Sequence, residues 1–171
     1  MLLSDIQNQV RVALDEVGIG LSQVLPILVA ANHQAAELIV VEQPELHLHP
    51  AVQVAPGDLF IETALGKQKK WQTTRPDRLN LNGSGRSSST SALIETHSEH
   101  LILRLLRRIR ETTAQELPPG VKGLKTDQIA VLYVAATDEG VRYSELRVDD
   151  EGEFIDRWPN GFFEERTEEL F

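Results

Sequence analysis

The sequence predicts an α/β fold, and three observations support this. A short apolar run, a polar loop and a helical segment follow one another twice along the chain, which is typical of α/β layering. Of the 171 residues, 41% are hydrophobic and 25% are charged, as expected for a folded domain with a sizeable core. The pattern becomes β-rich toward the C-terminus. We therefore expect a partly parallel sheet flanked by helices in residues 1–117 and a small β-rich domain in residues 118–171.

The first segment allows two interpretations. Val10, Val12 and Leu14 alternate with polar or small residues, as in a half-buried strand. One side of a helix is equally possible, and both interpretations stay open; its residues would be Ile6, Val10, Ala13 and Val17. Gly18 and Gly20 interrupt the pattern. Ser22 is then placed to cap a helix that carries Pro26 in its first turn, where proline is tolerated.

Two apolar runs without alternation predict the strands of the parallel sheet. They are residues 38–41, which Pro44 follows closely, and residues 92–94. Such runs are typical of strands that are covered on both faces. The second run leads into an amphipathic helix over residues 101–109. Its polar face carries four arginines: Arg104, Arg107, Arg108 and Arg110.

The remaining segments are a polar insert and a hairpin. Residues 66–91 contain very few apolar side chains, and we expect residues 80–91 to be disordered because they cannot bury enough surface to offset their conformational entropy. Residues 129–135 and 141–148 are β-rich and flank a turn, which predicts a hairpin. The tail over residues 162–171 is expected to form a short acidic helix.

The net charge of −9 is spread unevenly. Residues 66–111 hold ten Lys and Arg against four Asp and Glu, whereas residues 138–171 hold twelve Asp and Glu against four Lys and Arg. The basic stretch could contact nucleic acid phosphates. Two solvated surfaces are the simpler alternative, and both interpretations stay open.

Composition also excludes several classes of site. The chain has no cysteine, which excludes a disulfide, a thiolate zinc site and a cysteine nucleophile. It has neither an apolar stretch of about 18 residues nor a charged-then-apolar leader, so we expect a cytoplasmic protein without a membrane span.

Polar residues follow both predicted parallel strands. The first strand ends in Glu42, and His97 follows the second. Ligand sites lie at the carboxyl ends of parallel strands, where nucleoside triphosphatases hold an acidic group beside Mg²⁺. A second interpretation combines Glu42 and His97 with His47 and His49 in a metal-dependent hydrolase.

Three strings extend this pattern. They are VGIGLSQ at residues 17–23, VVEQPELHLHP at residues 40–50 and ETHSEHL at residues 95–101. In order and spacing they resemble the signature region, the Walker B and D-loop segment, and the switch histidine of ATP-binding cassette (ABC) ATPases. The resemblance is to the RecF, SMC and OLD type, in the bacterial branch often labelled AAA family ATPases. It implies the C-terminal lobe of an ATPase head, and residues 158–165 resemble a small domain of unknown function that ends many of these proteins.

The resemblance implies ATP and Mg²⁺ as cofactors and a dimer of heads. Glu42 would hold Mg²⁺ directly or through water, and His97 would sense the γ-phosphate. Gly20 and Ser22 would face the γ-phosphate of a nucleotide bound by the opposite subunit, where backbone N–H groups at a helix start donate hydrogen bonds. Two further residues of the same strings are expected near the nucleotide: Gln23 and His49.

One position departs from the family pattern. The residue that usually serves as the catalytic glutamate is Gln43, which can orient a water but cannot take its proton. Glu45 is the nearest residue that could replace it as the base.

The chain also lacks a P-loop. No G-x-x-x-x-G-K-[ST] string occurs, and we interpret the Gly- and Ser-rich residues 83–90 as a linker because the lysine and a preceding strand are missing. In the family the P-loop lies in the N-terminal lobe, so turnover would need a missing P-loop lobe or a full-length ATPase as partner. The alternative is a non-catalytic half-head that serves interaction only.

Overall fold

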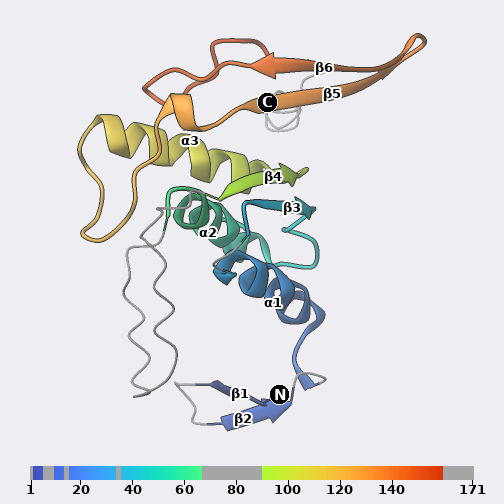
Figure 1. The fold of residues 1–171 in the computed structure, drawn as a ribbon, viewed down its shortest axis with the longest axis vertical. Coiled ribbons are helices and arrows are strands. Elements are labelled where there is room, and N and C mark those ends of the chain that lie inside the picture. The colour runs from blue at the N-terminus through green and yellow to red at the C-terminus, as the bar shows by residue number, and fades with distance from the viewer. Residues whose placement is uncertain (1, 6–9, 14–15, 34–35, 67–89, 160–171) are drawn as a thin grey trace, which may run out of the picture. The chain divides into compact units, whose positions relative to one another are not determined.

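A computed structural model describes residues 2–5, 10–13, 16–33, 36–66 and 90–159 (Figure 1). The chain divides into two compact units, Met1–Ser98 and Glu99–Phe171. Three predictions fall wholly or largely outside the described residues: the disorder of residues 80–91, the linker at 83–90 and the helix at 162–171. Within the described part, Thr90 is buried and Ser91 already belongs to a strand, so residues 90 and 91 correct the predicted end of the insert.

The ambiguous first segment forms a strand. β1 (Leu2–Asp5) and β2 (Val10–Ala13) pair antiparallel, with Leu2 opposite Ala13. Hydrophobic periodicity could not decide between strand and helix here, because it does not show whether a neighbouring strand is present to pair with.

The helix after this hairpin begins earlier than predicted. α1 runs over Ile19–Asn32, and Gly18 is its N-cap residue, with its carbonyl accepting from the N–H groups of Leu21 and Ser22. The prediction that Ser22 caps the helix is therefore wrong. The Ser22 hydroxyl instead donates to the Ile19 carbonyl, 3.1 Å away, as serine does inside a helix. Pro26 consequently lies in the helix interior and not in the first turn.

The parallel pair of strands is confirmed. β3 (Leu38–Glu42) and β4 (Ser91–Glu95) pair in parallel, from Leu38 opposite Ser91 to Glu42 opposite Glu95. α1 contacts β3, α2 (Ala55–Ala64) contacts β4, and the two helices contact each other. A short 3-10 helix, η2 (Pro50–Val52), lies between β3 and α2.

The two strands are not covered on both faces, contrary to the prediction. Ile39 is buried, but the exposed fractions are 57% for Leu38, 66% for Val40 and 57% for Leu93. Within the described residues, this apolar face has no layer of its own chain over it. Exposed and less exposed residues alternate along both strands, because helices cover only one face of this sheet. Parallel sheets usually have helices on both faces.

The second unit combines one helix with the predicted hairpin. α3 (Glu99–Thr113) buries Leu101, Ile102, Leu106 and Ile109. η3 (Thr126–Gln128) leads into β5 (Val131–Thr137) and β6 (Gly140–Leu146), which pair antiparallel. The Trp158 ring packs edge-on against both Tyr133 and Phe154. The described fold is therefore α/β, with a parallel pair and a separate antiparallel hairpin.

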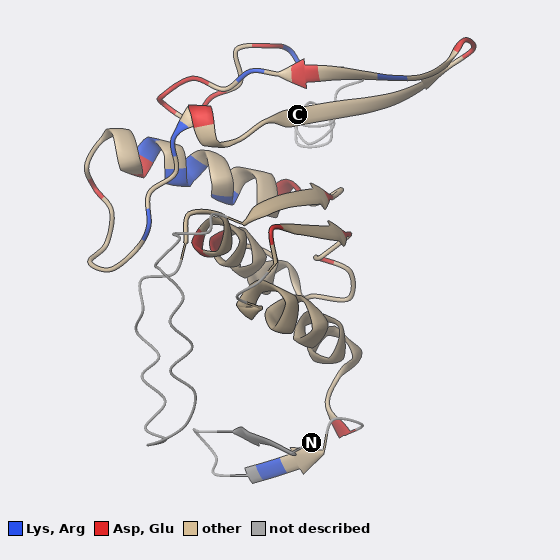
Figure 2. Ribbon diagram, in the orientation of Figure 1, with Lys and Arg blue, Asp and Glu red and all other residues tan. Residues whose placement is uncertain are grey.

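Positive charge gathers on α3 (Figure 2). The prediction of a solvated basic face needs one correction, because Arg108 is only 3% exposed. In the described part of the chain, no helix has the length and apolar character that crossing a membrane requires.

Candidate functional site

The carboxyl ends of β3 and β4 form the centre of the candidate site. The two strands are parallel and in register, so Glu42 and Glu95 end them side by side. Each strand then continues into a polar loop: residues 43–49, called the 43–49 loop, and residues 96–98, called the 96–98 turn. Residues that are about fifty positions apart in the sequence therefore meet at one sheet edge, as the sequence predicts for Glu42 and His97.

The 43–49 loop leaves the sheet by an unusual backbone path. The Gln43 N–H donates to the Glu95 carbonyl at 2.8 Å, which extends the strand pairing by one bond. Gln43 and His47 both have positive φ values, 47° and 60°. Such conformations are uncommon for residues other than glycine, and where they persist the surrounding contacts hold them.

Glu45 joins this loop to the 96–98 turn. Its Oε2 accepts from the Thr96 hydroxyl at 2.8 Å, and its Oε1 accepts from the His97 N–H at 2.9 Å. The Thr96 hydroxyl oxygen in turn accepts from the Ser98 N–H at 3.0 Å. Both carboxylate oxygens of Glu45 thus have a partner in the turn.

The His97 side chain is exposed, although its backbone is anchored. The side chain is 72% exposed, and Nε2 lies 3.4 Å from Oε1 of Glu95, which is 52% exposed. Motif spacing does not identify Glu95. Its position as the last residue of the second apolar run is the signal that could have identified it, because strand ends converge in a parallel sheet.

A second connection between the loops also escaped the sequence analysis. Gln53 donates from Nε2 to the Leu48 carbonyl at 3.1 Å, and its Oε1 accepts from the Ser98 hydroxyl at 2.8 Å. Ser98 is only 5% exposed. Nothing in the sequence around Gln53 indicates this role, since its partners come from two other segments.

The start of α1 lies against the 43–49 loop. A Cβ atom on Gly20 would stand 2.5 Å from the His47 carbonyl oxygen, so only glycine permits this approach. Gly20 therefore lies beside the loop that follows Glu42, whereas Ser22 bonds to its own helix and Gln23 is exposed. His49 accepts through Nδ1 from the Ala51 N–H at 3.2 Å and begins η2.

A metal site built from protein ligands needs several His, Asp or Glu side chains that lie close together. Among the described residues, no group of three His, Asp or Glu side chains could hold a metal ion. Glu42, His47, His49 and His97 all belong to that part of the chain, so the arrangement that a metal-dependent hydrolase needs is not formed by them. A nucleotide-bound Mg²⁺ makes a smaller demand, because phosphates and waters supply most ligands and one or two carboxylates suffice. Exposed Glu42 at the strand end fits that demand.

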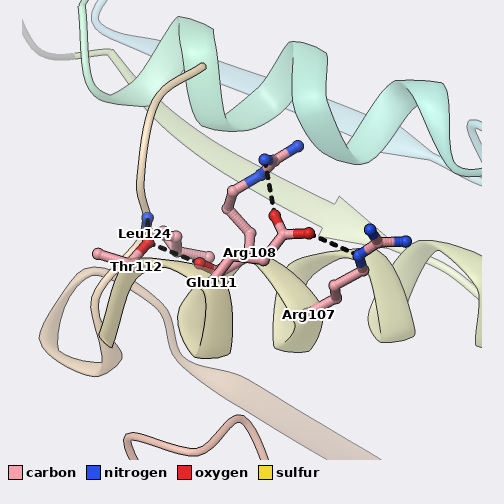
Figure 3. A network of polar contacts seen from close by, with 5 residues as sticks. All are labelled: Arg107, Arg108, Glu111, Thr112 and Leu124. Carbon is pink, nitrogen blue, oxygen red and sulfur yellow. Dashed lines mark hydrogen bonds and ion pairs between the residues drawn. The ribbon is translucent and has the colours of Figure 1, made fainter. Parts of the chain in front are cut away.

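The arginines of α3 make ion pairs within their own unit (Figure 3). Glu111 accepts from Arg107 Nε at 2.6 Å and from Arg108 Nη1 at 2.9 Å. Arg110 lies 3.7 Å from Glu153. The Thr112 hydroxyl donates to the Arg108 carbonyl and accepts from the Leu124 N–H, which ties the helix to the segment after it. Arg107, Arg108 and Arg110 thus form ion pairs within this unit, and Arg108 is buried.

Comparison with known proteins identifies one segment. Residues 124–171 match a family described as "Protein of unknown function (DUF3696)". This agrees with the predicted domain of unknown function at the C-terminus. No curated protein matches the chain, and no solved structure matches it either. The description of the matching family names no activity, so the resemblance to ABC ATPases stays a prediction.

Proposed function

We propose that this chain is the second half of an ATP-binding and ATP-hydrolysing head, and that turnover needs a P-loop from another lobe or partner. The observation that carries the proposal is the in-register parallel pairing of β3 and β4. It brings Glu42 and the 96–98 turn to one sheet edge, where an acidic metal ligand and a γ-phosphate sensor would have to meet.

The residues at this edge have distinct roles in the proposal. Glu42 would bind Mg²⁺ directly or through a water, and this ion would neutralise charge on the nucleotide phosphates. His97 would donate a hydrogen bond to the γ-phosphate, for which its exposed ring has room. Gln43 would orient the attacking water. Gly20 and Ser22 would approach a nucleotide held by the opposite subunit of a dimer.

The uncovered sheet face supports the need for a partner. Leu38, Val40 and Leu93 expose apolar side chains on one face of a two-stranded parallel sheet. Parallel sheets are usually covered on both faces, whereas these side chains are exposed in the part of the chain that the structure describes. We infer that a P-loop lobe with an apolar face of its own covers these strands.

The test has two steps. The coding sequence immediately upstream is read in all frames for a strand followed by a P-loop, and the lobe found is co-expressed with this chain. We expect ATP hydrolysis by the complemented head only, and a loss on the order of 100-fold in Glu42→Ala, because the Mg²⁺ ligand is gone. Glu62→Ala, at an exposed position of α2, is the matched control. An unchanged rate in Glu42→Ala would overturn the metal role of Glu42.

ATP binding by the chain alone tests the half-head directly. Calorimetry should detect no micromolar affinity for Mg²⁺-ATP without the partner lobe, since the phosphate-binding backbone of a P-loop is missing. Micromolar binding by the isolated chain would contradict the proposal that its nucleotide site is incomplete.

A non-catalytic half-head is the second candidate function, and one observation favours it. Gln43 stands where the family carries the catalytic glutamate, and both oxygens of Glu45 are already hydrogen-bonded. In that case the complemented head would bind ATP and dimerise without hydrolysing it. Measuring binding and hydrolysis on the same sample separates the two functions.

A further inference from the structure

We propose that Glu45 is a positioning residue that fixes the switch histidine His97, and that it does not serve as the base. The inference rests on the proposed function and assigns a role to one residue of that site. The carboxylate of Glu45 bridges the 43–49 loop and the 96–98 turn through two hydrogen bonds, one to a side chain and one to the backbone of His97 itself.

The two bonds constrain the backbone on both sides of the imidazole. The Thr96 hydroxyl donates to Glu45 and accepts from the Ser98 N–H, so it is held from two directions. The Ser98 hydroxyl donates to Gln53, which closes the turn from the other end. Hydrogen bonds to a carboxylate are about twice as strong as those between neutral groups, so Glu45 contributes the strongest of these restraints.

The loop that carries Glu45 is itself held in place. His47, two residues further on, has a left-handed backbone, and its carbonyl lies where a side chain on Gly20 would stand. α1 therefore supports the 43–49 loop, and the loop supports the 96–98 turn through Glu45. The imidazole of His97 is 72% exposed beside Glu95, so it can face a ligand while its backbone is held.

A base and a positioning residue respond differently to Glu45→Gln. Glutamine keeps one oxygen for the His97 N–H, and its NH₂ group can donate to the Thr96 hydroxyl, which has a second lone pair. The turn should therefore persist, while proton abstraction at residue 45 becomes impossible. Glu45→Ala removes both bonds.

The first measurement is hydrogen exchange of the His97 amide in the full chain. We expect protection to fall on the order of tenfold in Glu45→Ala and to change less than threefold in Glu45→Gln, because the hydrogen bond from the His97 N–H to the carboxylate contributes about 1 kcal/mol. Thr96→Val removes both hydrogen bonds of the hydroxyl, to Glu45 and from the Ser98 N–H, at nearly constant volume, and Thr96→Ser keeps the hydroxyl. These variants keep the test valid if Glu45→Ala does not fold. Unchanged protection in both Glu45→Ala and Thr96→Val would overturn the proposal.

The second measurement is ATP hydrolysis by the complemented head as a function of pH. A positioning role predicts that Glu45→Gln keeps a rate within threefold of wild type with the same pH profile, whereas Glu45→Ala loses about tenfold. A collapse of the rate in Glu45→Gln, with His97 protection intact, would identify Glu45 as the base and overturn the proposal. If the wild-type head hydrolyses no ATP, the proposed function fails, and the exchange experiment still decides whether Glu45 holds the turn.

Discussion

At the scale of single residues, Gly152 combines two demands that only glycine meets. Its φ is 74°, and a Cβ atom there would overlap the Leu106 carbonyl of α3. Gly120 has a similar φ of 80° but open space around it, which makes it a matched control. The positive φ alone costs roughly 1–2 kcal/mol with a side chain present, and the backbone overlap at Gly152 adds to this cost.

We therefore expect Gly152→Ala to lower the free energy of unfolding by about 3 kcal/mol and Gly120→Ala by about 1 kcal/mol. Urea unfolding of both variants measures the difference. Equal losses of unfolding free energy in the two variants would mean that only the positive φ matters. The close approach of Gly152 to α3 would then contribute nothing to the cost.

The same scale shows why some site residues could be predicted and others could not. Glu42 and His97 end or follow apolar runs, so periodicity and motif spacing identify them. Glu95 and Gln53 acquire their roles from contacts with loops far away in the sequence, and no local pattern records such contacts. Ser22 shows the opposite error, because a residue type that favours helix caps predicted a cap where there is none. The helix already begins one turn earlier, after Gly18.

At the scale of elements, an ion pair closes the region after β6. Arg147 donates to Asp156 from its backbone N–H at 2.8 Å and from its guanidinium at 2.7 and 3.0 Å. The side-chain hydrogen bond from Arg147, followed by the backbone one, lowers the pKa of Asp156 from 3.8 to about 2. The turn that precedes Asp156 is stabilised separately, since Asp149 accepts from the N–H groups of Glu151 and Glu153.

The lowered pKa of Asp156 determines how the stability of this region depends on pH. A carboxyl whose pKa is lowered by folding contributes its stabilisation in full above the unfolded value near 3.8, and the contribution is lost as the pH falls through about 2. We expect an NMR titration of Asp156 to give a midpoint near 2 in the wild type and a higher midpoint in Arg147→Ala, which loses the guanidinium and keeps the backbone N–H donor. Arg142→Ala, on β6, is the control. A wild-type midpoint near 3.8 would contradict the ion pair.

The positions of the elements were largely predictable, and the wrong predictions about their burial have a common cause. Residues 38–41 and 92–94 were identified as parallel strands because uninterrupted apolar runs are typical of such strands. The helix over residues 101–109 was identified from its amphipathic spacing, but Arg108 on its basic face proved to be buried. Burial depends on what packs against an element, and a single sequence records this only indirectly.

At the scale of the whole molecule, the sheet face that carries Val40 is exposed in the part of the chain that the structure describes, and the proposed P-loop lobe would cover it. Val40 is 66% exposed in β3, and Val134 is 62% exposed in β5 of the other unit. Both are valines in the middle of a strand, so an aspartate should reduce strand propensity equally at the two positions. Val40 belongs to a parallel pair and Val134 to an antiparallel hairpin, and a partner is proposed to cover Val40 only.

We expect Val40→Asp to weaken association with the P-loop lobe at least on the order of tenfold, because a charge would be buried without a partner, and Val134→Asp to leave it unchanged. Unfolding of the isolated chain should shift by about 0.5 kcal/mol or less in both variants, as for most surface substitutions. Titration of each variant with the partner lobe measures the effect. Equal affinities for the wild type and Val40→Asp would mean that the lobe binds elsewhere, and a loss confined to Val40→Asp would place the sheet face in the interface.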